Sequence, residues 1–223
     1  MSRSALTLLA VVSTACGGSV LGPSHSHATI HPSDSVVTQT RDVGSFSGIS
    51  LSGVGHLVAE PGSTDTLTIT ANENVLPHLV SEVRGGVLHL EARDMGEVQG
   101  ELHVEYHVTV RQLDEVHASG VTTAEVHGVD ARRFRVEISG VSSVVAEGRA
   151  DRQDISVSGV SAYEAEQLST RVTHVLMSGV SHAVVDVSER LEGSLSGPSQ
   201  LVYIGSPSVS VTTAGGSTVR PQG

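Results

Sequence analysis

The sequence predicts an all-β protein in which repeats of roughly 18–20 residues stack into a solenoid. The first observation is a phrase of Ser, Gly, Val and then Ser or Thr that returns at regular intervals. A fixed period of this size is typical of stacked units that cannot bury a core alone. The spacing between successive copies stays nearly constant, as the glycines of the phrase and of its altered copies show: Gly120, Gly140, Gly159, Gly179, Gly197 and Gly215.

The second observation is an alternation of apolar and polar residues inside each repeat. A period of two is the pattern of a strand with one buried face, and a repeat that also contains a glycine turn leaves no room for an amphipathic helix. Each repeat is therefore predicted to be two or three short strands. The apolar positions that follow the glycine are Val126, Ala146, Ala165, Val185 and Tyr203, and those that precede it are Ile138, Val157, Met177 and Leu195.

The repeated glycines are predicted to be structural turns. A chain that turns back every few residues needs positive φ or close backbone approach, and glycine supplies both. The flanking Ser and Thr are expected to hydrogen-bond the local backbone and to form a ladder of hydroxyl groups along one corner. A serine in every repeat, without a G-x-S-x-G elbow, indicates structure rather than catalysis. The predicted turn glycines are Gly120, Gly140, Gly159, Gly179 and Gly197.

Residues 1–15 resemble the signal peptide of a bacterial lipoprotein. Arg3 precedes a short apolar run that is too short to span a bilayer, and Cys16, the only cysteine, follows directly. We therefore expect Cys16 to be acylated, although Ser13 stands where a lipobox prefers leucine. The alternative is an ordinary secretory peptide that leaves a free thiol at Cys16.

Residues 16–41 are predicted to be a flexible tether, because Gly, Pro, Ser and Thr are frequent and no period is sustained. His25, His27 and His31 are close enough in sequence to bind a metal ion, but histidines are also ordinary residues of a polar linker. Residues 42–112 are predicted to be β-rich but less regular. Residues 113–219 are predicted to be the repeats of the same domain.

The longest alternating run, residues 102–110, carries His103, Glu105 and His107 on its predicted outer face. His89 and Glu91 could lie on a neighbouring strand. Two histidines four residues apart on a strand are about 13 Å apart, at roughly 3.3 Å per residue, and cannot share one zinc ion. No metal and no cofactor are therefore predicted.

Three acids, Glu147, Glu166 and Asp186, occupy the same predicted repeat position and would form an acidic column. In-register stacking would set their backbones roughly 4.8 Å apart, so that calcium could bridge them weakly. The same column suggests a carbohydrate-active β-helix enzyme as an alternative. Aromatic residues that could stack on sugar rings make up only 2% of the chain, and there is no Trp.

The net charge of −11, in a chain whose basic residues are all Arg, argues against a nucleic-acid partner. It also argues against docking to anionic lipids by charge. Attachment to a membrane is expected through the N-terminal acyl chains instead.

The order of motifs is similar to that of a known family. A Phe-x-x-Ile-x-x-Ser-Gly opening at residues 46–53 precedes an Ala-Asn-Glu-Asn-x-Leu-Pro segment at residues 71–77, a Gly-x-Leu-x-Leu strand at residues 86–90 and the serial repeats. This order resembles the auto-transporter adhesin head GIN domain family of bacterial surface lipoproteins, over about residues 43–219. The resemblance implies a right-handed, single-stranded β-helix without enzymatic activity, and it supplies no catalytic residues. Pro198, a departure in the fifth repeat, suggests that the regular stack ends there.

We therefore expect a non-enzymatic, exported cell-envelope lipoprotein at the bacterial outer membrane or cell surface. Its β-solenoid would serve adhesion or the binding of a polysaccharide or an envelope protein, because repeats build a long surface rather than a pocket. The alternatives are an accessory protein of envelope signalling and the carbohydrate-active enzyme.

Overall fold

The computed structural model describes residues 29–223, which are almost entirely β-structure and include one short turn of 3₁₀ helix. The predicted all-β class is confirmed. The elements are β1 (Thr29–Ile30), β2 (Val36–Arg41), β3 (Gly48–Pro61), β4 (Thr66–Asn72), η1 (Leu76–His78), β5 (Leu79–Arg84), β6 (Val87–Ala92), β7 (Glu97–Val98), β8 (Val104–Val110), β9 (Glu115–Ile138), β10 (Val141–Val157), β11 (Val160–Met177), β12 (Val180–Leu195), β13 (Gln200–Ile204), β14 (Ser208–Thr213) and β15 (Thr218–Pro221).

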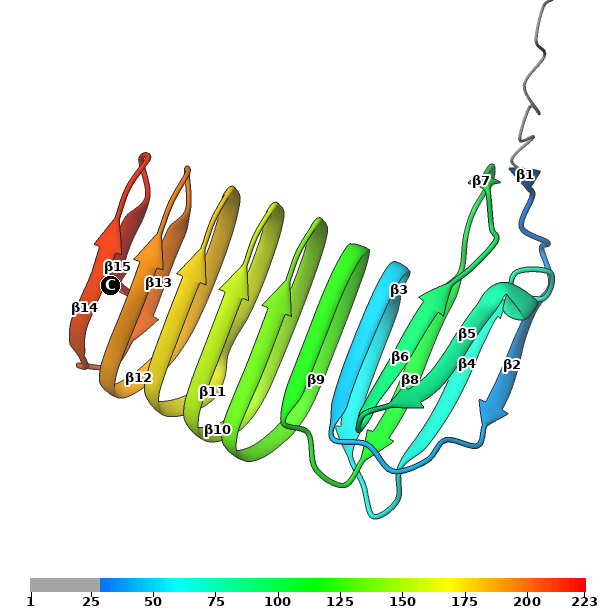
Figure 1. Cartoon of the computed structure of the whole chain (residues 1–223), viewed down its shortest axis with the longest axis horizontal. Coiled ribbons are helices and arrows are strands. Elements are labelled where there is room, and N and C mark those ends of the chain that lie inside the picture. Colours follow the sequence, from blue (N-terminus) through cyan, green and yellow to red (C-terminus); the bar gives the residue numbers. More distant parts are fainter. Residues whose placement is uncertain (1–28) are drawn as a thin grey trace, which may run out of the picture.

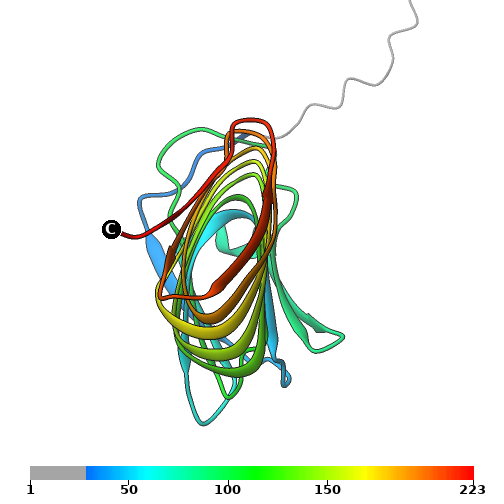
Figure 2. The ribbon, with the colours of Figure 1, turned by 90° about the vertical axis from the view of Figure 1, so that its left-hand side faces the viewer.

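Thirteen of these strands form one continuous sheet, and β1 pairs with β7 in a separate two-stranded sheet. Figure 1 shows the sheet as a row of parallel ribs that runs from β3 to β14 and β15. Seen from the end of the row, the chain winds around a flattened interior (Figure 2). We call each turn of the winding chain a rung.

The rungs stack because equivalent repeat positions pair in parallel. Val136 of β9 lies opposite Ile155 of β10, which lies opposite Val175 of β11. All three side chains are buried, so each interior position continues as a column of apolar residues through the stack. The repeat period of the sequence therefore sets the register of the sheet.

The stack begins earlier than the sequence repeats indicate. β3 pairs in parallel with β9, with Gly53 opposite Gly120 and Val54 opposite Val121. Residues 52–54 are thus the first Ser-Gly-Val copy, although β4 to β8 intervene along the chain between Gly53 and Gly120. The intervening residues form strands that cover this end of the stack.

These covering strands include part of the predicted tether. β2 pairs antiparallel with β4 along its whole length, and Thr29–Ile30 pairs with Glu97–Val98. The prediction of a tether over residues 16–41 is therefore wrong for the two strands that it contains. The six residues of β2, Val-Val-Thr-Gln-Thr-Arg, have no apolar–polar alternation that would separate the strand from a polar linker.

The stack also extends beyond Pro198. β13 follows two residues later and pairs with β12, and β15 pairs with β13. The expectation that Pro198 ends the regular stack is wrong. The proline lies in the corner between β12 and β13, at the position where Val180 donates a backbone hydrogen bond to the Gly159 carbonyl one rung earlier. Proline cannot make this bond, but the Ser199 hydroxyl donates to the Gly179 carbonyl at 3.2 Å, and the stack continues.

Asp65 and Arg111 join the covering strands through a nearly buried carboxylate. Asp65 accepts hydrogen bonds from the backbone N–H of Arg111 at 3.0 Å and from the guanidinium Nη2 at 2.6 Å. These bonds, chiefly the side-chain one, hold the pKa of Asp65 below its usual value despite desolvation. The carboxylate therefore stabilises the folded state above its unfolded pKa of about 3.9.

We expect Asp65→Asn to lower the free energy of unfolding at pH 7 by about 1–2 kcal/mol, a value reduced by the half-exposed guanidinium. The stabilisation by Asp65 disappears as the pH falls through its lowered folded pKa, so the loss should shrink below about pH 4. Urea unfolding at pH 7 and pH 3 measures both. Asp130→Asn, which breaks an exposed pair with Arg149, is the control and should change little. Equal losses in the two variants at pH 7 would contradict the prediction.

Candidate functional site

A row of exposed valines follows the glycine corners. One valine stands directly after the corner glycine in each of five successive rungs, and the row continues to Pro198. Large apolar side chains at this exposure leave much of their surface in water. The valines and their exposed fractions are Val54 42%, Val121 59%, Val141 56%, Val160 58% and Val180 57%.

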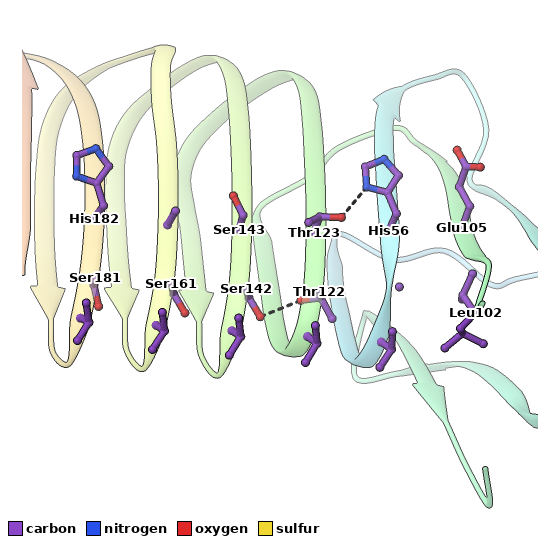
Figure 3. A pocket seen from close by; sticks show the side chains of 18 of the residues that line it. His56, Leu102, Glu105, Thr122, Thr123, Ser142, Ser143, Ser161, Ser181 and His182 are labelled. Carbon is purple, nitrogen blue, oxygen red and sulfur yellow. Dashed lines mark hydrogen bonds between the residues drawn. The ribbon is translucent and has the colours of Figure 1, made fainter. Parts of the chain in front are cut away.

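In four of the five rungs, the residue after the valine is a buried Ser or Thr that closes the corner, whereas Gly55 follows Val54. Ser161 Oγ donates a hydrogen bond to the carbonyl of Ser158 at 2.8 Å, and Ser181 Oγ does the same to Ser178 at 2.6 Å. Thr122 donates to Ser142, as Figure 3 shows. These buried hydroxyls therefore have local acceptors, which suits the structural role that the sequence predicted.

The corner glycines themselves have the left-handed backbone that only glycine adopts easily. Gly140 has a φ of +80° and Gly179 one of +78°. A Cβ on Gly179 would lie 2.5 Å from the carbonyl oxygen of Gly159 in the rung below. Gly120, Gly159 and Gly197 also have positive φ and face the glycine of the preceding rung.

The valine row forms the floor of a groove with a volume of about 1000 Å³. A second outward row lies beside it, and Figure 3 shows His56, Thr123, Ser143 and His182 in this row. Residues 102–105, which precede and begin β8, line the end of the groove near β3. The groove thus runs along the stack, across many rungs, rather than into the core.

The charges in the groove are few. Glu105 is the single acid among its lining residues, and no arginine lines it. His56 Nδ1 is 2.7 Å from the Thr123 hydroxyl, and His182 Nε2 is 3.8 Å from Glu164 at the groove's margin. Burial raises the pKa of Glu164 above its usual value. The groove is therefore mainly apolar, with polar groups along one side.

A second hollow of about 550 Å³ has a different character. Arg149 makes a bidentate contact with Asp130, with distances of 3.0 and 2.7 Å. Arg171 Nε lies 2.8 Å from Glu189 in the next rung. Arginines and acids thus pair between neighbouring rungs, whereas Arg132 and Asp151, which also line the hollow, have no ion-pair partner within 4.0 Å among the described residues.

The predicted acidic column does not form. Glu147 lies opposite Gln167, and Asp186 lies opposite Ser169, because the strands shift register at bulges in this part of each rung. Glu166 falls inside the irregular stretch and has no partner acid in register. Glu147 instead lies 2.6 Å from His127 Nδ1, and Asp186 accepts a hydrogen bond from Ser169.

The predicted histidine face exists but gathers no metal ligands. His103 and His107 lie 3.9 and 3.7 Å from Glu105, on the outer face of the β8 region. Glu91 is engaged by Arg84 and Arg93. Among residues 29–223, no group of three or more His, Cys, Asp or Glu side chains is arranged to hold a metal ion.

Several predicted residues lie outside the described part of the chain. Cys16, His25 and His27 precede residue 29, where the described structure begins. His31 contributes its backbone carbonyl to a hydrogen bond from Asn74. Within the described residues, no helix has the length and apolar character needed to cross a membrane.

Comparison with known families identifies the domain. The family described as "Putative auto-transporter adhesin, head GIN domain" matches residues 45–207, well over half of the sequence. The chain belongs to this family. The matched range includes β3 to β13, and therefore both the first rung and the later repeats. No curated protein matches the chain.

Solved structures share the fold at low sequence identity. A "putative adhesin" from Bacteroides fragilis is 20% identical, with a TM-score of 0.73, and the match covers 86% of this chain and 100% of that one. A "putative adhesin" from Parabacteroides merdae is 16% identical, with a TM-score of 0.55 and coverages of 87% and 99%. A "putative lipid binding protein" from Parabacteroides distasonis is 15% identical, with a TM-score of 0.53 and coverages of 88% and 100%.

The groove is the feature that sequence reasoning missed. The valines were visible in the repeated phrase, but their outward direction depends on the corner geometry. The residues at the end of the groove come from a segment that the repeats do not include. A signal was nonetheless present, because valine follows the glycine in five rungs while the residue two positions later varies freely.

Proposed function

We propose that this head GIN domain is a non-enzymatic binding module of the bacterial cell envelope whose ligand surface is the valine groove. The single observation that carries the proposal is the row of five exposed valines along the floor of that groove. Exposed apolar stripes on soluble domains mark interaction surfaces. An extended groove across several rungs suits a polymer or a protein segment, in keeping with the adhesin names of the family and its structural relatives.

The proposal includes a right-handed, single-stranded β-solenoid as the scaffold. It is supported by the parallel pairing of each rung with the next and by the flattened winding of the chain in Figure 2. Parallel connections within one sheet are right-handed in nearly all proteins. Each rung adds one valine to the groove, so the length of the binding surface follows from the number of rungs.

The proposed location is the outer membrane or cell surface, with the domain held by acyl chains on Cys16. The family suggests an exported or surface protein, and the apolar run before Cys16 supplies the signal. We expect Cys16→Ser to release the protein from the membrane fraction in a soluble form. Mass spectrometry of the wild-type N-terminus should show an acyl mass, and a soluble, unmodified wild-type protein would contradict the anchor.

The binding role is tested with a screen of glycans and purified envelope proteins. The bait is the full chain carrying Cys16→Ser. A second protein, the double variant, carries Val141→Thr and Val160→Thr in addition. Threonine keeps the shape and strand preference of valine but removes an apolar contact. Val145→Thr on the same strand, 44% exposed and outside the groove, is the control.

A partner that binds the bait and the control but not the double variant supports the groove as the ligand surface. A screen in which every partner binds the double variant as tightly as the bait would refute it. The carbohydrate-active enzyme is the less favoured alternative, because the acids that motivated it do not share a register position.

A further inference from the structure

The valine row is more uniform than its place in the fold requires. All five positions are exposed, so core packing does not select valine there. Extended backbone does not select it either, because threonine forms strands as readily and is better hydrated. Two residues later in the same rungs, the outward row varies and is mostly polar: His56, Thr123, Ser143, Ala162 and His182. Valines of adjacent rungs pair in register, and neighbouring residues cover about half of each one. The exposed half remains free to contact an apolar ligand.

The dimensions of the row fit one extended hydrocarbon chain. Four steps separate Val54 from Val180, which at about 4.8 Å per step is roughly 19 Å. This is about the length of an extended palmitoyl chain. The row is one valine wide and lines an open groove, so one extended acyl chain can lie along it in contact with all five valines.

The charges favour a head group that is not a net anion. The single carboxylate of the lining, Glu105, stands at the end of the groove near β3, with His103 and His107 at 3.9 and 3.7 Å from its oxygens. The whole chain carries a net charge of −11, which disfavours a fatty-acid carboxylate or an anionic glycan. No Phe, Tyr or Trp lines the groove to stack on sugar rings. An ammonium group beside Glu105 would be attracted.

We propose that the valine groove binds the acyl chain of a zwitterionic, monoacyl lipid, with the ammonium of the head group beside Glu105. The inference rests on the proposed function, since it names the ligand class of the same groove. The methyl groups of Val121, Val141 and Val160 contact the middle of the chain. The hydroxyls of Thr123 and Ser143 edge the groove without closing it, so the ligand enters from the side.

The probe is lysophosphatidylethanolamine below its critical micelle concentration, titrated by calorimetry into the full chain carrying Cys16→Ser. Saturable binding of one lipid per chain is expected. Adding Val141→Thr and Val160→Thr should weaken binding about tenfold or more, whereas Val145→Thr should not change it. Glu105→Gln should weaken binding of this lipid but not of oleate. Melting temperatures of all variants verify that the fold is intact.

Several results would overturn the inference. One is the absence of saturable binding below the micelle concentration, and another is equal binding by the double valine variant. Binding to phosphatidylethanolamine vesicles without binding to the monomeric lipid would assign the groove to a membrane surface instead. If oleate binds as tightly as the zwitterionic lipid, the proposed contact between the head-group ammonium and Glu105 is wrong. If no lipid binds while the double variant loses a glycan or protein partner, the inference fails and the proposed function stands.

Discussion

Gly179→Ala is expected to lower the free energy of unfolding by about 3 kcal/mol or more, a large loss for one methyl group. The φ of +78° at this corner costs an L-residue about 1–2 kcal/mol. The new Cβ would also lie 2.5 Å from the carbonyl oxygen of Gly159, which belongs to backbone and cannot rotate away. The rungs must therefore separate or shift.

Gly86→Ala separates the two costs. Gly86 has nearly the same φ, +82°, but nothing lies within 4 Å of an added Cβ. Its substitution should cost only the conformational part, about 1–2 kcal/mol. Urea unfolding measures both variants. Hydrogen exchange should show lost protection in β11 and β12 for Gly179→Ala alone, because neighbouring rungs share their hydrogen bonds. Equal losses in the two variants would show that the contact between the new Cβ and the Gly159 carbonyl does not destabilise the fold.

The sequence was informative wherever structure depends on neighbouring residues along the chain. The corner glycine, its inward Ser or Thr and the alternating core positions all lie within one repeat, and they indicated strands and turns directly. Val136, Ile155 and Val175 pair as their repeat positions require. Local periodicity was sufficient here because each rung contacts chiefly the rungs before and after it.

Predictions failed where pairing depends on residues that do not repeat. Glu147, Glu166 and Asp186 each lie the same number of residues after their corner glycine. Bulges of different length shift the strand register between the glycine and the acid, so the three acids do not pair. The first rung escaped notice because the covering strands separate Gly53 from Gly120. The groove required knowledge of both the outward valines and a distant segment at its end. The repeat period of the sequence therefore does not predict a functional surface that several separate segments form together.

The interior of the stack contains one polar pair whose contribution to stability is unusual. Gln153 is fully buried, and its Nε2 donates a hydrogen bond to the hydroxyl of Tyr163, which is also fully buried. The Gln153 Oε1 has no hydrogen-bond partner among the described residues. Burial raises the pKa of Tyr163 far above its usual value, so the phenol stays neutral. A buried carbonyl without a partner costs about 1–3 kcal/mol of folding free energy.

Tyr163→Phe alone should destabilise the fold by about 1–3 kcal/mol, because it leaves the Gln153 amide without its acceptor. Gln153→Met alone removes the unpaired carbonyl but leaves the Tyr163 hydroxyl without its hydrogen-bond partner. The two effects oppose each other, so the free energy of unfolding should change little. The double variant Gln153→Met and Tyr163→Phe removes every polar atom of the pair while nearly keeping the volume. It should therefore be more stable than the wild type by about 1–3 kcal/mol.

A double-mutant cycle by urea unfolding measures the coupling between the two sites. Phe134 lies opposite Gln153 in the adjacent rung and is fully buried, so the methionine side chain would meet an apolar neighbour there. Strictly additive effects of the two substitutions would show that the pair does not interact. A double variant less stable than Tyr163→Phe would show that Gln153 Oε1 is satisfied in solution, by a water molecule or by a shifted neighbour, and that the polar pair supports the stack.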